Sequence, residues 1–268
     1  MNTIKVVMGF LELAAALKFF RTAELRWVSM PSLFTYDLVL SLWVVLFVVA
    51  GLYLLGLFKL PHDHDAGEHH IGPFRLLTAI LLMAFGVYLA PGLFSNGREK
   101  TRPAGTVYAW VDAFLLPEPT LGAVSGDGEL MWSGDLRRSL DDARGKGGYV
   151  FVDFTGKTCS NCRLNEKNVF SQAEFKDLLA KFTRVQLYTD TVDAGFYDGA
   201  VDLARQDADA AVNAKFEKES FAAEQLPLYV ILKPEPGGKT TVAGVYAEGK
   251  INNVNEFRDF LKKPFEKK

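Results

Sequence analysis

The apolar residues of this chain crowd into its first third, and short apolar runs alternate with charged stretches over the rest. Segments 38–58 and 76–94 contain no charged residue. Each has about the roughly 20 residues that an α-helix needs to cross a bilayer. Because they are apolar on every side, they are typical of transmembrane helices rather than of helices with one buried face.

A third apolar segment, 4–20, is interrupted by Lys5, Glu12 and Lys18. Lys5 and Glu12 lie two helical turns apart and share a face, so we expect that face to contact protein rather than lipid. A secretory signal with the alanines at 14–16 as its cleavage region is the alternative, but a glutamate inside so short an apolar core argues against it. We therefore predict three transmembrane helices.

Residues 1–95 are thus predicted to form a membrane part, and residues 96–130 a linker, because the latter are rich in proline and glycine. Within this linker, 107–116 is apolar enough either to lie against the membrane or to pack on the next domain. Residues 131–268 alternate between helical and strand patterns, as in an α/β domain with a central sheet. The predicted helices of this domain are 133–144, 159–170, 171–182, 208–223 and 254–263, and the predicted strands are 149–154, 184–188, 228–232 and 240–246.

One stretch of this domain has the residues for redox chemistry. The strand at 149–154 leads through Thr155 and Gly156 to Cys159-Ser-Asn-Cys162, and these are the only two cysteines of the chain. At a helix N-terminus, unpaired N–H groups and the helix dipole favour the thiolate form of Cys159. Cys162 lies one turn further on the same side, close enough to close a disulfide. A bridge over so short a loop stabilises a fold little, so we predict that the pair serves thiol–disulfide exchange.

This stretch resembles the thioredoxin superfamily, and within it the C-terminal domain of the DsbD family of membrane thiol–disulfide interchange proteins. Asp153, six residues before Cys159, matches the buried aspartate of thioredoxins, and Leu226-Pro227 matches their cis-proline. Glu166 and the apolar segments upstream carry the likeness to DsbD. The run 5–19 is similar to the last third of the DsbD membrane domain.

The resemblance implies a thioredoxin-like α/β domain with a central mixed sheet over about residues 130–265, after about three transmembrane helices. Cys159 is then expected to attack a partner disulfide, and Cys162 to resolve the mixed disulfide. Asp153, desolvated in its strand, is expected to have a raised pKa and to take the proton of Cys162. Thr158 stands where thioredoxins usually have a tryptophan, so the surface that meets the partner differs from theirs.

Two further positions each have two interpretations. Glu166 lies one turn beyond Cys162 on the same helix face, where it either tunes the thiols or is an ordinary exposed glutamate. Pro227 is expected in a cis peptide bond beside the cysteines, which leaves the preceding backbone free to pair with an incoming peptide strand. An ordinary trans proline at the start of a strand is the alternative.

Charge and histidine content change the picture little. The formal net charge of −2 indicates no nucleic-acid partner. All four histidines lie in the loop 62–70, but their spacing matches no standard zinc pattern, so we predict a solvated connection and no metal site or cofactor. Basic residues do not settle the membrane orientation, because Lys59 and Arg75 flank this loop and three more lie at 98–102. The DsbD resemblance places the C-terminal domain in the periplasm.

Together these features predict a multi-pass protein of the bacterial inner membrane whose thioredoxin-like domain reduces disulfides of periplasmic partner proteins. The resemblance also implies a place in cytochrome c biogenesis. DsbD proteins receive electrons from cytoplasmic thioredoxin through cysteines of the membrane domain, and no cysteine precedes Cys159 here. Either the chain is a fragment or truncated gene product, which we favour, or another protein supplies the electrons. The expected donor is a membrane-domain dithiol or cytoplasmic thioredoxin.

Two other functions stay open. A membrane-tethered copper-handling protein would use the cysteine pair together with the histidine loop. A non-catalytic thioredoxin-like module would bind client proteins without exchanging disulfides with them.

Overall fold

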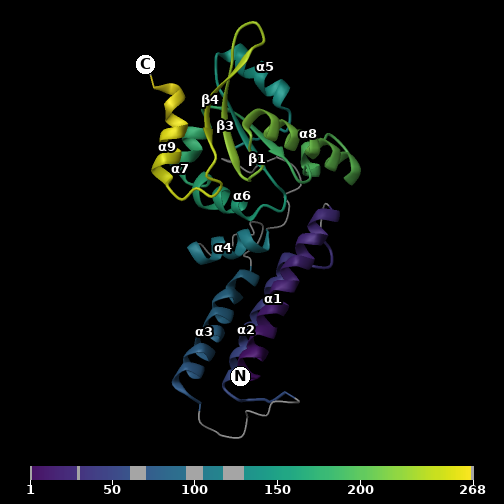
Figure 1. The fold of residues 1–268 in the computed structure, drawn as a ribbon, viewed down its shortest axis with the longest axis vertical. Coiled ribbons are helices and arrows are strands. Elements are labelled where there is room, and N and C mark those ends of the chain that lie inside the picture. Colours follow the sequence, from purple (N-terminus) through teal and green to yellow (C-terminus); the bar gives the residue numbers. More distant parts are fainter. Residues whose placement is uncertain (1, 29–30, 61–70, 95–104, 117–129, 267–268) are drawn as a thin grey trace. The chain divides into compact units, whose positions relative to one another are not determined.

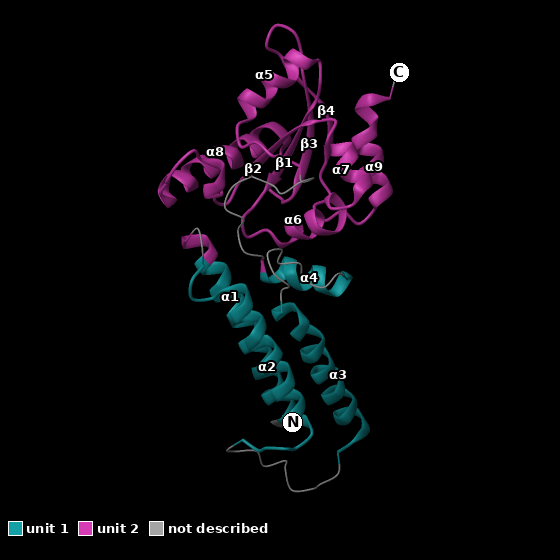
Figure 2. Ribbon diagram, turned by 180° about the vertical axis from the view of Figure 1, so that it is seen from behind, with its two compact units in different colours: residues 1–24, 31–115 teal, residues 25–30, 116–268 magenta. Residues whose placement is uncertain are grey.

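The computed structural model describes residues 2–28, 31–60, 71–94, 105–116 and 130–266 of the chain. The chain divides into two compact units (Figure 2). Unit 1 comprises residues 1–24 and 31–115, and unit 2 comprises residues 25–30 and 116–268. The histidine loop 62–70 and most of the predicted linker lie outside the described residues.

Unit 1 is helical and holds most of α1 (Asn2–Trp27), together with α2 (Tyr36–Leu54), α3 (Pro73–Leu89), the 3-10 helix η1 (Ala90–Leu93) and α4 (Thr106–Leu115) (Figure 1). Within the described ranges, Tyr36–Leu54 and Pro73–Leu93 are the two helical stretches long and apolar enough to cross a membrane. They coincide with the predicted segments 38–58 and 76–94. α1 covers the predicted segment 4–20 but does not meet the same criteria, so a third membrane helix stays a prediction.

α2 and α3 pack closely at positions where glycine provides room. A Cβ atom on Gly51 of α2 would clash with Met83 and lie 2.9 Å from the backbone oxygen of Ala79, both on α3. A Cβ atom on Gly86 of α3 would lie 3.1 Å from the backbone oxygen of Val44 on α2. Small residues at such contacts let helix backbones approach, which is the common way that helices pack within a membrane.

Unit 2 is built on a four-stranded mixed sheet with the strand order β2-β1-β3-β4. Its strands are β1 (Val150–Thr155), β2 (Thr183–Tyr188), β3 (Leu228–Pro234) and β4 (Thr240–Tyr246). β1 pairs parallel with β2 and antiparallel with β3, and β3 pairs antiparallel with β4. Because β1 is central and buried at every position, its sequence is a nearly continuous apolar run. The predicted mixed sheet is confirmed.

Helices cover both faces of this sheet (Figure 1). They are α5 (Leu136–Lys146), α6 (Ser160–Asn165), the π-helical turn η2 (Glu166–Phe170), α7 (Ala173–Leu179), η3 (Ala194–Phe196), α8 (Leu203–Phe221), α9 (Val254–Lys262) and η4 (Lys263–Phe265). One core joins Phe151 of β1 to η2, α7 and α9, and the other joins Phe154 of β1 to α5 and α8. α8 begins five residues before the predicted 208, because the side chain of Asp202 caps it by accepting from the N–H of Arg205.

Candidate active site

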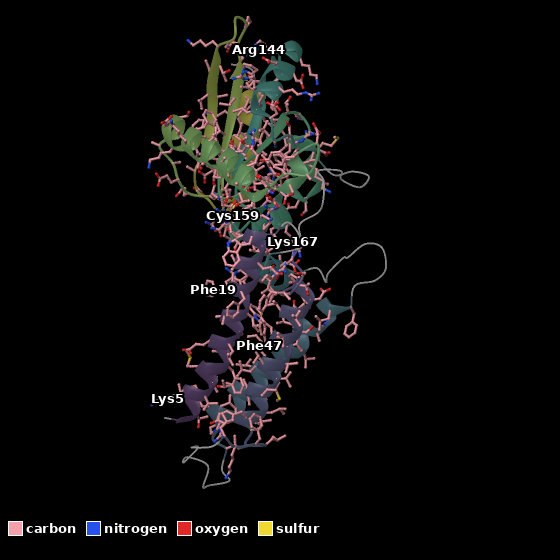
Figure 3. All side chains as sticks on the ribbon, turned by 90° about the vertical axis from the view of Figure 1, so that its right-hand side faces the viewer. Lys5, Phe19, Phe47, Arg144, Cys159 and Lys167 are labelled. Carbon is pink, nitrogen blue, oxygen red and sulfur yellow. A yellow bond between two sulfur atoms is a disulfide. The ribbon has the colours of Figure 1, made fainter. Side chains whose placement is uncertain are left out.

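The cysteine pair lies where β1 is followed by α6, and Cys159 is labelled in Figure 3. Cys159 is the N-cap residue of α6, and its Sγ accepts a hydrogen bond from the backbone N–H of Cys162 at 3.1 Å. A disulfide joins the two residues, whose Cα atoms are 5.3 Å apart. Cys162 is 1% exposed, whereas Cys159 is half-buried. Cys159 is therefore the more accessible cysteine of the pair.

A network of polar side chains connects β1 and β2 to the helix that contains the cysteines. Asp153 of β1 is buried and lies opposite Gln186 of β2 in the parallel register. Gln186 Nε2 donates to Asp153 Oδ2 at 3.1 Å and to Glu166 Oε1 at 3.4 Å. Arg163 Nη1 donates to Glu166 Oε2 at 2.6 Å. One amide thus links two carboxyl groups, and an arginine partners one of them.

Both carboxyl groups of this network have raised pKa values. Burial, reinforced by the negative charge of Glu166, raises the pKa of Asp153 to about 8, although the hydrogen bond from Gln186 and the charge of Arg163 oppose the shift. Burial also raises the pKa of Glu166, against the charge and hydrogen bond of Arg163. The pKa of Asp153 is therefore close to that of an ordinary thiol, about 8.5.

Three residues predicted from the sequence come together in this region. Glu166 follows Cys162 by four residues, so the two side chains lie on one side of the helix, a turn apart. Gln186 then connects Glu166 to Asp153. Glu166 is half-buried and accepts a hydrogen bond from Arg163, and its effect on the thiols stays a prediction.

Leu226–Pro227 is a cis peptide bond directly before β3. Leu228 pairs with Phe154, so Pro227 lies beside the end of β1, where the turn to the cysteines begins. Leu226 approaches the same turn, because a Cβ atom on Gly156 would lie 3.1 Å from Leu226 Cδ1. Pro227 and the turn that leads to the cysteines therefore lie at the same end of the two central strands.

Asp190, just after β2, holds the turn that precedes Cys159. Its carboxylate accepts hydrogen bonds from the backbone N–H groups of Lys157 at 2.8 Å and Thr158 at 2.9 Å. It also accepts one from the Thr158 hydroxyl at 2.9 Å. Thr158 thus binds the carboxylate through two donors. A Cβ atom on Gly156 would lie 3.1 Å from Asp190 Oδ2, so glycine leaves room for this approach.

Sequence reasoning missed Gln186, Asp190 and Arg163 as parts of the site. Gln186 offered a signal, since it is a polar residue inside the otherwise apolar run 185–188 of a predicted strand. Asp190 follows that strand, and only the parallel pairing of β1 with β2 brings it to the cysteine turn. Arg163 offered none, because a helical arginine is usually exposed.

The metal question concerns mainly residues that the structure does not describe, because the histidine loop lies among them. Over the described ranges, no group of three or more histidine, cysteine, aspartate or glutamate side chains is arranged to hold a metal ion.

Comparison with known proteins first defines a class. Residues 131–234 match a family model described as thioredoxin-like. A solution structure of a thioredoxin from Thermus thermophilus is 20% identical, with a TM-score of 0.37, and the match covers 50% of this chain and 85% of that one. The family match defines residues 131–234 as a thioredoxin-like domain.

A more particular likeness follows. The chain is 26% identical over 189 residues to the thiol:disulfide interchange protein DsbD of Pseudomonas sp. (strain JR1 / K1). The match covers 70% of this chain but only 29% of that protein. The domain is thus DsbD-like, as the sequence predicted. That protein is named for thiol–disulfide interchange, and the domain described here holds a closely spaced cysteine pair.

Proposed function

We propose that this chain is a membrane-anchored protein-disulfide reductase that passes electrons through Cys159 and Cys162 to disulfides of periplasmic partner proteins. The observation that carries the proposal is the pairing of an accessible N-cap cysteine with a buried one. The Asp153 carboxyl group has a pKa of about 8. It belongs to the polar network that includes Glu166, one helical turn beyond Cys162.

The reaction starts from the dithiol form. The Cys159 thiolate attacks one sulfur of the partner disulfide, a new S–S bond forms, and the other partner sulfur leaves as a thiolate that takes up a proton. Cys162 then loses its proton and attacks Cys159 Sγ. This step closes the Cys159–Cys162 disulfide and releases the second partner thiol. Two electrons and two protons pass to the partner, and the product is the disulfide form that the structure shows.

Asp153 is our candidate for the proton acceptor of the second step. A buried thiol loses its proton reluctantly, because burial disfavours the thiolate. A carboxyl group whose pKa is close to that of the thiol exchanges a proton with it at little cost. Glu166 and Gln186 connect Asp153 to the helix of Cys162 and position it for this exchange. Pro227 would present the backbone before β3 to the partner peptide.

The disulfide form must be reduced again before the next turnover. A dithiol is the chemical class of reductant required, and a membrane-domain dithiol or cytoplasmic thioredoxin fits the DsbD-like direction of electron flow. No cysteine precedes Cys159 in this sequence, so residues 1–158 contain no thiol that could relay these electrons. The relay therefore has to come from cysteines that this sequence does not contain.

The membrane location rests on unit 1. α2 and α3 have the length and composition of membrane spans and pack through glycine. Large apolar side chains point outward from both helices, and Val45, Leu81 and Val87 are each more than half exposed. Exposure of such an apolar surface to water is unfavourable, whereas lipid acyl chains would cover it. We propose a multi-pass inner-membrane protein with α1 as a third span, the thioredoxin-like domain in the periplasm and a role in cytochrome c biogenesis.

The exchange reaction is tested with the reduced full chain in detergent micelles and a disulfide-bonded protein such as insulin. Wild type should reduce it, and Cys159→Ser should not. Cys162→Ser should stop at a covalent mixed disulfide. Asp153→Asn should prolong the mixed disulfide by about 10²- to 10⁴-fold, the usual contribution of an acid–base group, whereas the exposed Asp177→Asn on α7 serves as the unchanged control.

The same assay separates the other functions. Partner binding without reduction by wild type would indicate a non-catalytic module. A wild-type chain that does not reduce the protein disulfide but binds Cu(I) tightly at its dithiol would indicate copper handling. Fusion of a periplasm-dependent reporter enzyme to the C-terminus tests the orientation, and an inactive reporter would contradict a periplasmic domain.

A further inference from the structure

α4 is fixed at the end of α3. The hydroxyl oxygen of Tyr108 on α4 accepts a hydrogen bond from the N–H of Gly92 at 2.8 Å and donates one to the carbonyl of Leu89. A Cβ atom on Gly92 would lie 2.7 Å from the same oxygen, so glycine permits the contact. The N-terminal half of α4 is therefore held where the second apolar span ends.

The same helix is also fixed at the beginning of α2. Asp112 accepts a hydrogen bond from the hydroxyl of Tyr36, which is the first residue of α2. Val111 and Leu115 are buried in a core that includes residues of the first turns of α2. Tyr108, Val111, Asp112 and Leu115 are spaced as one helix face, so this face of α4 is turned to the other helices of unit 1.

The opposite face is apolar, and the other helices of unit 1 leave it open. Val107 is 46% exposed and Trp110 is 52% exposed. Phe114 lies at the margin of this face: it is half-buried, with its ring centroid 5.9 Å from that of Trp43, and it stacks on Trp110 with ring centroids 5.4 Å apart. The single charged residue of α4, Asp112, is on the buried face. A helix bathed in water has the reverse pattern, with polar residues outside.

Neighbouring residues of unit 1 extend this surface. Lys18 Nζ lies 5.0 Å from the ring centroid of Phe114, so α1 passes close to α4 at this point. The next residues, Phe19 and Phe20, are more than half exposed, and Phe19 is labelled in Figure 3. Aromatic side chains with a lysine beside them therefore gather around the end of the α2–α3 pair.

We propose that α4 lies in the interface of a lipid bilayer, with Val107 and Trp110 at the boundary between headgroups and acyl chains. Tryptophan prefers this depth, since its ring is apolar and its N–H is polar. The Lys18 ammonium group suits the phosphate of the headgroups. The ends of α2 and α3 that meet α4 mark one edge of the two spans. The inference rests on the proposed membrane location. Of the two surfaces expected for residues 107–116, the membrane and the next domain, it selects the membrane.

The test uses the full chain with Trp110 as its only tryptophan, made by Trp27→Phe, Trp43→Phe and Trp132→Phe, in vesicles of zwitterionic and anionic phospholipid. The lipids carry bromine at different acyl depths. Shallow bromine should quench Trp110 fluorescence at least twofold more than bromine near the bilayer centre. A chain that keeps only Trp132, in the thioredoxin-like domain, is the control and should show no quenching by either lipid.

The outcomes are distinct. Trp110 that stays unquenched while the chain floats with the vesicles overturns the inference and leaves the membrane anchor intact. Strongest quenching by deep bromine also overturns it, because α4 would then lie within the bilayer core. A chain that does not float with vesicles refutes the anchor and the inference together.

A second measurement covers the case in which the tryptophan replacements disturb folding. A nitroxide attached at Val107→Cys, in a chain with Cys159→Ser and Cys162→Ser, reports accessibility to oxygen and to a water-soluble nickel complex. An oxygen-to-nickel accessibility ratio between those of a nitroxide in water and a nitroxide in the bilayer core is expected at the interface. A ratio equal to that of a nitroxide in water would place the helix face in water and overturn the inference.

Discussion

Asp153 and Gln186 occupy paired positions on the parallel strands β1 and β2, and the amide of Gln186 donates to the Asp153 carboxyl group at 3.1 Å. The same amide nitrogen lies 3.4 Å from Glu166. A strand pairing thus places a buried acid next to a second acid on the cysteine helix. The first two predictions follow from this arrangement.

Asp153→Asn should make the stability of the thioredoxin-like domain less dependent on pH. The folded pKa of Asp153 is about 8 and its ordinary value is 3.8, so the folded domain holds the extra proton between these values. Stability therefore falls as pH rises from about 4 through about 8. The asparagine variant lacks this loss and should be more stable than wild type at pH 9, by on the order of a few kcal/mol, with little difference at pH 4. Urea denaturation curves of both proteins, with unfolding of unit 2 detected by its sensitivity to proteolysis, measure this difference at each pH. Parallel plots of unfolding free energy against pH would contradict the raised pKa of Asp153.

Glu166→Gln should lower the pKa of Asp153. The Glu166 charge is the second cause of the raised value, after burial, so its removal leaves burial alone to raise the pKa, against the opposing effects of Gln186 and Arg163. Carbon NMR titration of labelled aspartate measures the shift directly. Glu174→Gln on α7 is the matched control, because Glu174 is paired at the surface with Arg258. An unchanged or higher pKa of Asp153 in Glu166→Gln would show that the two carboxyl groups are not coupled.

Asp190→Ala should slow the attack of Cys159 on a partner disulfide. The variant leaves three donors of the Lys157–Thr158 turn without their acceptor, which we expect to cost roughly 1–3 kcal/mol of stability. If half of that cost appears in the attacking step, mixed-disulfide formation slows by about 2- to 10-fold. Stopped-flow mixing with an aromatic disulfide measures the rate.

Asp190→Asn retains one acceptor oxygen and should fall between wild type and Asp190→Ala. The exposed Asp198→Ala is the control for a change of charge nearby in the sequence. If Asp190→Ala and Asp198→Ala react equally fast, the hydrogen bonds to the turn do not position the nucleophile.

Gly51→Val should separate α2 from α3. The added side chain meets Met83 and the backbone of Ala79, and overpacking of this kind typically costs about 1–3 kcal/mol. Gly9→Val on α1 is the matched control, since a Cβ atom there has no neighbour within 4 Å. The melting temperatures of the two variants, measured as loss of helicity by circular dichroism in detergent micelles, are compared. Equal melting temperatures would mean that the close contact of α2 and α3 is unimportant for stability.

The sequence predicts those parts of the molecule that local patterns determine. The uncharged runs 38–58 and 76–94 specify two long apolar helices, and the apolar run before Cys159 specifies the central strand. The position of Leu226–Pro227 before a strand and the thioredoxin resemblance together predict a cis bond, and the structure has it in cis.

The remaining features depend on contacts between distant parts of the chain. Gln186 meets Asp153 only because β2 pairs with β1 in one particular parallel register. Asp190 reaches Thr158 across 32 residues, which no local pattern reveals. The burial of Tyr108 and Asp112 on one face of α4 likewise depends on α2 and α3. Register and packing, rather than propensity, determine these contacts.

The reduction potential of the Cys159–Cys162 pair tests the central claim most directly. The full chain in detergent micelles is equilibrated with dithiothreitol or glutathione redox buffers, and free thiols are counted by alkylation. We predict reversible two-electron cycling with a potential of about −270 to −200 mV, the range of thioredoxin and glutaredoxins. A potential near −120 mV would contradict a reductase, since that value is typical of an oxidant. A pair that does not cycle reversibly would contradict thiol–disulfide exchange itself.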